Sequence, residues 1–325
     1  MIRYALIRIL SAIPILLGVS VVSFGLLFLQ PGNPVEALLP LEASPQIAEM
    51  MKQQLGFDQP VWRQYLAWLQ RTVQGDLGVS LYDGLPVAGQ LGGALFNTMV
   101  LAIPAAVLAF VLGGALGLIA GYHRNTWIDR SASALAIVGV SLPQYWVAIV
   151  LVVLFSVTVN WLPASGMASP DGIPRSFSDL ANMVMPVLAL MLVPMGVVAR
   201  VVRASVQDIL SQDFIAGLQA KGLARGRILR HVVRNAMSAA LSVMGLQFGF
   251  LLGGSILIEV VFNWPGSGQL LNLAIFRRDI PVLQGTVVVV AGLFVLTTLF
   301  LPHGIAGLIP QVRERIALQG PSCHD

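Results

Sequence analysis

The chain has 325 residues, of which 56% are apolar and only 10% are charged. Soluble domains carry roughly 25% charged residues, and a soluble protein of this length cannot bury so much apolar surface. The composition therefore excludes a soluble globular protein. The formal net charge is +4 and the isoelectric point is about 9.6; both follow from membrane topology, as argued below, and do not argue for a nucleic-acid partner.

Six apolar windows without Asp, Glu, Lys or Arg follow one another along the chain. Each can hold the roughly 20 residues that a helix needs to cross the hydrocarbon layer. They predict an all-α polytopic membrane protein with six transmembrane helices. The third window is long, but Pro143 and the stretch 163–170 interrupt it, so we count it as one span. The windows are 9–35, 84–122, 131–170, 180–199, 235–258 and 280–312.

The first window follows Arg3 and Arg8. A basic start followed by an apolar run is also the pattern of a secretory signal peptide. Its apolar run is longer than the usual 7 to 15 residues of a signal peptide, and Gln30, Pro31 and Gly32 make a poor cleavage site. We predict an uncleaved first span.

A long segment, 32–93, separates the first two spans. Within it, 61–73 has the pattern of an amphipathic helix with an apolar stripe of Trp62, Tyr65, Trp68 and Leu69. Such a stripe either lies on the membrane surface, where Trp and Tyr are enriched, or packs on the spans. We favour packing.

Glycines repeat every four residues in two of the predicted spans. One series is Gly113, Gly117 and Gly121, and the other is Gly245, Gly249 and Gly253. Small residues at this spacing let two helix backbones approach closely in lipid. They predict packing surfaces, either within the chain or across a dimer.

A charged island from Arg200 to Arg234 lies between the fourth and fifth windows and holds seven of the nineteen Lys and Arg residues. Its centre, 211–223, predicts a short helix with Phe214, Ile215 and Leu218 on one face. A plain basic loop is the alternative, but it does not explain an apolar face outside the membrane. We expect such a helix to dock on another protein.

Both ends of this short helix carry stop signals. Ser211 or Asp213 offers an N-terminal cap. At the other end Gly222 can take the left-handed conformation that stops a helix, with Leu223 folding back onto the last turn.

The distribution of Lys and Arg predicts the orientation of the spans. With the N-terminus in the cytoplasm, thirteen of these residues lie on the inner side and six on the outer side, while ten acidic residues lie outside and five inside. Both termini are therefore predicted to be cytoplasmic.

Few residues offer site chemistry. Glu259, at the outer end of the fifth window, either contacts substrate or a binding protein, or lies at the level of the lipid headgroups. Cys323 and His324 make only a weak metal site, and a single cysteine excludes an internal disulfide. The two lysines, Lys52 and Lys221, stand in no phosphate-binding loop. We predict no catalytic residue, metal or cofactor, and no substrate-binding residue can be named.

Several blocks resemble the permease subunits of binding-protein-dependent ABC importers, in the dipeptide, oligopeptide and nickel branch. Two lie in the charged island: AKGL (220–223) and HVVRNA (231–236). Their order and spacing along nearly the whole chain make the resemblance specific. The other blocks are PGNP (31–34), LGFDQP (55–60), GDLGVS (75–80), SLP (141–143), WLPASG (161–166) and WPGSG (264–268).

The resemblance implies a type I permease fold and a division of the chain. Residues 1–94 would hold the first span and the external segment, 95–308 the permease core with its cytoplasmic coupling loop at about 204–234, and 309–325 a cytoplasmic tail. The coupling loop would contact an ATPase subunit. The residues implied in this contact are Asp213, Phe214, Leu218, Ala220, Lys221, Gly222 and Leu223.

The resemblance also implies partners and a function. The chain would be a multi-pass inner-membrane subunit without ATPase activity of its own, working with a second homologous permease, two cytoplasmic ATPase subunits and an external substrate-binding protein. Membrane lipid would surround it. The implied substrate is a short peptide, with nickel or a nickel chelate as the alternative. A stand-alone secondary carrier or channel, and a membrane enzyme, are the alternatives from other classes.

Overall fold

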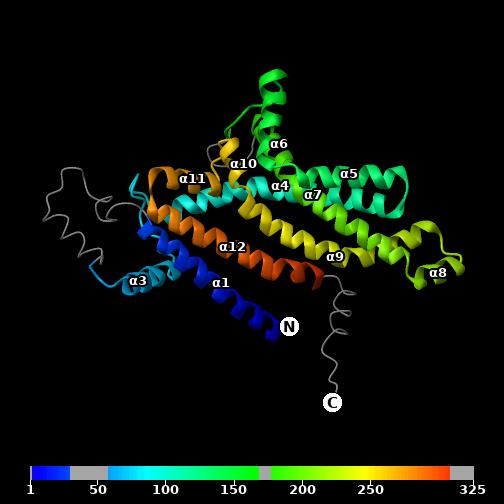
Figure 1. The fold of residues 1–325 in the computed structure, drawn as a ribbon, viewed down its shortest axis with the longest axis horizontal. Helices are drawn as coiled ribbons and strands as arrows, with labels where there is room; N and C mark the ends of the chain where they lie inside the picture. Colours follow the sequence, from blue (N-terminus) through cyan, green and yellow to red (C-terminus); the bar gives the residue numbers. More distant parts are fainter. Residues whose placement is uncertain (1, 30–57, 168–176, 308–325) are drawn as a thin grey trace, which may run out of the picture. The chain divides into compact units, whose positions relative to one another are not determined.

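A computed structural model describes residues 2–29, 58–167 and 177–307 of the chain, and its secondary structure there is helical apart from one isolated bridge between Val79 and Pro86. The helices are drawn in Figure 1. They are α1 (Ile2–Leu29), α3 (Val61–Val73), α4 (Val87–Tyr122), α5 (Trp127–Ser141), α6 (Gln144–Leu151), the π-helix η2 (Val152–Thr158), α7 (Phe177–Leu210), α8 (Asp213–Ala220), α9 (Arg225–Gly254), α10 (Ile256–Val261), α11 (Ser267–Arg277) and α12 (Ile280–Gly307).

Five of these helices are long and apolar enough to cross a membrane: α1, α4, α7, α9 and α12. A sixth span results when α5 is joined to the continuous run of α6 and η2, which bends away from it by 98°. The bend has a local cause. Leu142 is extended (φ −79°, ψ 130°), because the ring of Pro143 disfavours a helical residue before it. The predicted six spans agree with this count, the third being sharply broken.

The described residues belong to two compact units, Met1–Asn97 with Pro265–Gly292, and Thr98–Trp264 with Leu293–Asp325. In the second unit α7 is the central helix. Its apolar residues pack against α4, α6, α9 and α10 in one cluster that includes the fully buried Trp264 and Leu190.

Close backbone contacts flank α7 on two sides. A Cβ atom at Gly113 of α4 would lie 2.5 Å from the carbonyl oxygen of Met195, and one at Gly117 would lie 2.5 Å from that of Ala199. On α7 itself, Gly196 meets the backbone of Ala136 in α5. The first glycine series therefore packs within the chain.

The second glycine series is used only in part. A Cβ at Gly249 would lie 2.8 Å from the hydroxyl of Thr297 in α12, whereas one at Gly253 would meet nothing within 4 Å. The regular spacing predicted a packing surface that includes Gly253, but no neighbouring helix in the described part of the chain lies against that residue.

In the first unit α3 packs on α1, as predicted. The Tyr65 hydroxyl lies 2.8 Å from that of Ser20. The ring of Phe24 lies 5.5 Å from the ring of Tyr65 and 5.6 Å from that of Trp68. Trp62, which we placed on the same stripe, is exposed instead.

The start of α12 is tied to the loop before α4 in the same unit. The buried hydroxyl of Ser80 donates to Asp279 at 2.5 Å, and Asp279 also accepts from the backbone N–H groups of Leu81 and Val282. The GDLGVS block thus ends on the residue that anchors this loop.

Candidate functional site

The charged island is mostly helix. α7 continues to Leu210 and α9 begins at Arg225, with α8 between them. The segment 204–234 that we named the coupling loop thus includes the ends of both spans, whose helices continue beyond their apolar windows. Its role in coupling stays a prediction. Only Lys221 of the seven basic residues lies outside a helix. Two of the others lie on α7 and four on α9: Arg200 and Arg203, and Arg225, Arg227, Arg230 and Arg234.

The C-terminal end of α8 has the predicted geometry. Gly222 has a left-handed backbone with φ +71°. Its N–H donates to the carbonyl of Gln219 at 2.9 Å, and the N–H of Leu223 donates to that of Leu218 at 3.2 Å. This pair of bonds satisfies two carbonyls that the helix end would otherwise leave open. Gly222 therefore fixes where the helix stops.

The N-terminal end differs from our prediction. Gln212 is the capping residue, and its side chain makes no capping hydrogen bond. Ser211 instead donates its hydroxyl to the carbonyl of Asp208 at the end of α7, at 2.7 Å. Asp213 is the first helical residue. Its negative charge interacts favourably with the positive N-terminal end of the helix dipole.

The apolar residues of α8 face two directions. Ile215 is only 2% exposed and joins a cluster with Val206 of α7 and Val232 of α9. Phe214 is 40% exposed. Successive helix residues point about 100° apart, so these two cannot face the same surface. Ile215 therefore packs within the chain and is not available to a partner. Docking of the exposed part of α8 on another protein stays a prediction.

Leu218 and Leu223 are half-buried against this cluster. The other five residues named for ATPase contact are exposed: Asp213, Phe214, Ala220, Lys221 and Gly222. The chain thus presents a short surface of one aromatic ring, two charges and exposed backbone, held on a packed base. Ile215 belongs to the buried cluster beneath this surface. Its spacing along the helix does not show whether it packs inside the chain or contacts a partner.

An ion pair fastens α7 to α5 in the same unit. Arg203 donates through Nε to Oδ1 of Asp129 at 2.5 Å and through Nη2 to Oδ2 at 3.0 Å. Ser133 and the backbone N–H of Asn125 also donate to this carboxylate. We did not single out Asp129 from the sequence, since an acidic residue at a helix start is common.

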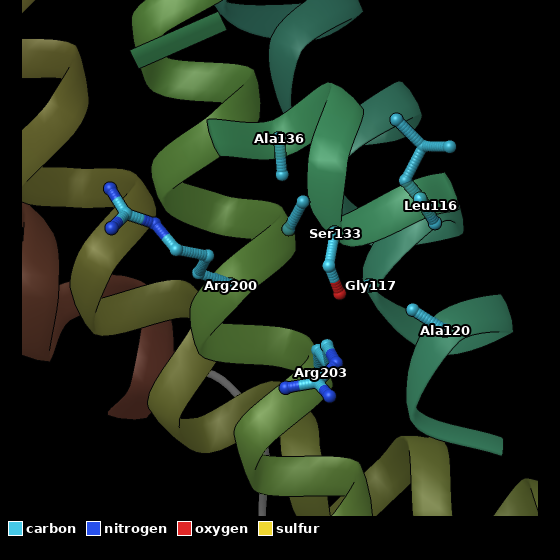
Figure 2. Close-up of a pocket in the computed structure, with 9 residues that line it drawn as sticks. Leu116, Gly117, Ala120, Ser133, Ala136, Arg200 and Arg203 are labelled. Carbon is cyan, nitrogen blue, oxygen red and sulfur yellow. The ribbon is translucent and has the colours of Figure 1, made fainter. Parts of the chain in front are cut away.

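A small pocket lies beside Arg203. Figure 2 shows it between α4, α5 and α7, with the Arg200 side chain extending away from Ser133. Most of the lining comes from small side chains: Gly117, Ala120, Ala132, Ala136 and Ala199. The pocket is a consequence of close helix packing, and its walls offer little for a ligand to bind.

Glu259 occupies a position that neither of our alternatives described. It lies on α10, after α9 ends, and its side chain is fully buried. Thr98 of α4 and Ser255 both donate hydroxyl hydrogen bonds to its Oε1, each at 2.8 Å. Protein therefore encloses this carboxylate, and it does not face lipid headgroups. Two hydroxyl donors offset part of the cost of burying it.

Among the described residues, no group of three His, Cys, Asp or Glu side chains is placed to hold a metal ion. Cys323 and His324 lie outside the described residues.

Comparison with known proteins identifies the family. Residues 113–313 match the family described as "binding-protein-dependent transport system inner membrane component". The chain belongs to this family. Residues 1–89 match the N-terminal region of the membrane components of the same transport systems. The protein is thus a multi-span inner-membrane subunit of a binding-protein-dependent ABC importer, as the resemblance implied.

Individual relatives match over nearly their full length. The chain is 35% identical to the dipeptide transport system permease protein DppB of Alkalihalophilus pseudofirmus, with 96% of this chain and 100% of that protein covered. It is 38% identical to the glutathione transport system permease protein GsiC of Escherichia coli K12, with 97% and 100% covered.

Proposed function

We propose that this permease subunit imports short peptides across the inner membrane, driven by separate ATPase subunits. The observation that carries the proposal is the exposed end of α8, which a left-handed Gly222 stops and Ile215 anchors to α7 and α9. A surface that is exposed to a partner and also packed on α7 and α9 can transmit the movement of that partner to the spans.

The contact with an ATPase subunit would use the seven residues that the resemblance implied. Phe214 offers an apolar side chain for a groove on the partner, and Asp213 and Lys221 offer charges at the two ends of α8. Leu218 and Leu223 act differently: they hold the C-terminal turn in place on the cluster beneath. The sequence has no phosphate-binding loop, which supports ATP hydrolysis by a separate subunit.

The complete transporter would hold a second homologous permease, two cytoplasmic ATPase subunits and an external substrate-binding protein. Both termini would be cytoplasmic, with residues 1–94, 95–308 and 309–325 as the N-terminal part, the permease core and the tail. The excess of Lys and Arg on the inner side supports this orientation. Cysteine labelling tests it: position 221 should react only with a reagent that reaches the cytoplasm, and position 58 with an impermeant external one. External labelling at 221 would reverse the topology.

Peptide is the favoured substrate because the two relatives named above are permeases for a dipeptide and for glutathione, itself a tripeptide. Nickel is not favoured by these relatives. Since binding proteins deliver the substrate, peptide length would depend strongly on that partner.

Reconstitution of the complete complex in liposomes tests the proposal. A labelled dipeptide should accumulate only when ATP, the ATPase subunits and the binding protein are all present. Accumulation without an ATPase would instead indicate a secondary carrier. Failure with peptides, together with ATP-driven uptake of nickel, would reject the substrate and keep the transporter class.

A further inference from the structure

Helix α3 carries two rows of apolar side chains, and only one of them packs on α1. Tyr65 and Trp68 form the packed row, with the ring of Phe24 between them and the Tyr65 hydroxyl next to Ser20. Thr72 continues this row and is half-buried.

The second row is Trp62, Leu66 and Val73, which follow one another at i, i+4 and i+11 on one side of the helix. Leu69 lies in the same row at i+7 and is half-buried, whereas the other three side chains are between 52% and 80% exposed. Ala67 and Arg71 lie on the other side of the helix, about 120° and 160° around its axis from this row, and are also exposed. The helix therefore has a polar face and an uncovered apolar face next to its packed row.

The contact with α1 sets how deep α3 lies. Among the described residues, the apolar window of that span runs from Leu10 to Phe28. Phe24 and Ser20 precede Phe28 by four and eight residues, so at 1.5 Å per residue the contact lies about 6 to 12 Å below the end of the window. Amphipathic helices in the membrane interface bury their apolar face roughly 5 to 10 Å, which is the same depth.

The exposed row of α3 also adjoins exposed apolar side chains of α1. On α1 the side chains of Leu17, Val21 and Phe28 are exposed, and they lie next to the row of Ser20 and Phe24 that contacts α3. α1 is a membrane span, so its exposed apolar side chains meet acyl chains. Acyl chains that contact Leu17 and Val21 would also contact the exposed row of α3.

Trp62 and its neighbour have the chemistry of this interface. The guanidinium carbon of Arg63 lies 5.1 Å from the centre of the Trp62 ring. An aromatic ring beside a cation suits the boundary where acyl chains meet phosphate headgroups.

We propose that α3 is an interfacial helix that rests on phospholipid. Trp62, Leu66 and Val73 contact acyl chains of the leaflet in which α1 ends, while Arg63 and Arg71 lie at the level of the headgroup phosphates. The helix would thereby hold the long segment that leads to α4 at a fixed depth. This inference depends on the membrane span α1 and not on the substrate.

Spin labels on the complete transporter in phospholipid bilayers test the proposal. After Cys323→Ser, single cysteines are introduced by Trp62→Cys, Leu66→Cys and Val73→Cys, with Ala67→Cys and Arg71→Cys as controls on the opposite face. Oxygen concentrates in the acyl region, whereas a nickel chelate relaxation agent stays in water. The ratio of oxygen to nickel collision rates should be severalfold higher at 62, 66 and 73 than at 67 and 71.

Two outcomes overturn the proposal. A high nickel collision rate at all five positions would mean that the row faces water. Low rates for both reagents at 62, 66 and 73 would mean that a protein covers it. ATP-driven uptake by each labelled variant serves as the check that the complex is folded.

Discussion

Arg203 of α7 holds the carboxylate of Asp129 of α5 through two parallel hydrogen bonds, of 2.5 Å and 3.0 Å. The Asp129 side chain is only 4% exposed, whereas that of Arg203 is 34% exposed. A planar guanidinium matches a carboxylate in this paired geometry, and a lysine does not. The pair joins the start of α5 to the part of α7 that leads into α8.

Removing one partner of this pair should destabilise the protein more than removing both. Arg203→Leu leaves a buried carboxylate without its cation, at a cost of about 3 kcal/mol. The double variant with Asp129→Leu should recover much of that loss. Thermal unfolding in detergent measures both, and Arg200→Leu, at an exposed position of the same helix, should have little effect. Equal losses in the single and double variants would contradict this reading.

Gly222→Val should uncouple transport without disturbing the spans. The left-handed backbone at Gly222 costs an ordinary residue about 1 to 2 kcal/mol and a β-branched one more. The end of α8 should fray, so uptake and substrate-stimulated ATP hydrolysis should be lost at near-normal membrane levels.

Gly217→Ala is the matched control for that variant. Gly217 lies inside α8 and a Cβ there meets nothing within 4 Å, so alanine should favour the helix and transport should persist. Normal uptake by Gly222→Val would instead show that the end of α8 has no role in coupling.

Phe214→Ala and Ile215→Ala separate surface contact from internal packing. The exposed Phe214 should be needed for assembly with the ATPase, so its loss should lower ATP-driven uptake and leave thermal stability unchanged. Ile215 is buried, and its truncation should cost about 2 to 5 kcal/mol of local packing. Thermal unfolding of the isolated permease, alongside co-purification with the ATPase, distinguishes the two. A loss of stability only in Phe214→Ala would reverse the assignment.

Gly113→Ala and Gly114→Ala test the contact between α4 and α7. A Cβ at Gly113 would lie 2.5 Å from the Met195 carbonyl oxygen, while one at Gly114 meets nothing within 4 Å. The first substitution forces two backbones apart and should cost about 1 to 3 kcal/mol, whereas the second should be neutral. Thermal unfolding of both variants measures this difference, and Gly113→Ala should unfold at the lower temperature. Equal unfolding temperatures would mean that α4 and α7 do not touch at Gly113.

The class of protein and the end of α8 could be predicted from the residues alone. Charge-free windows of sufficient length leave little choice but membrane spans, since a backbone in lipid must satisfy its own hydrogen bonds. Gly222 followed by Leu223 predicts a left-handed stop because few other residues tolerate that backbone. Pro143 likewise marked the break in the third window. These features depend on neighbouring residues alone.

Which side chains face inward could not be predicted, because it depends on how distant helices pack together. Phe214 and Ile215 are adjacent and equally apolar in pattern, yet α7 and α9 cover one and leave the other exposed. Glu259 is buried because Thr98, far away in the chain, supplies a hydroxyl, and Asp129 matters because Arg203 reaches it. Such pairs join distant positions, and local periodicity carries no information about which helix will lie opposite.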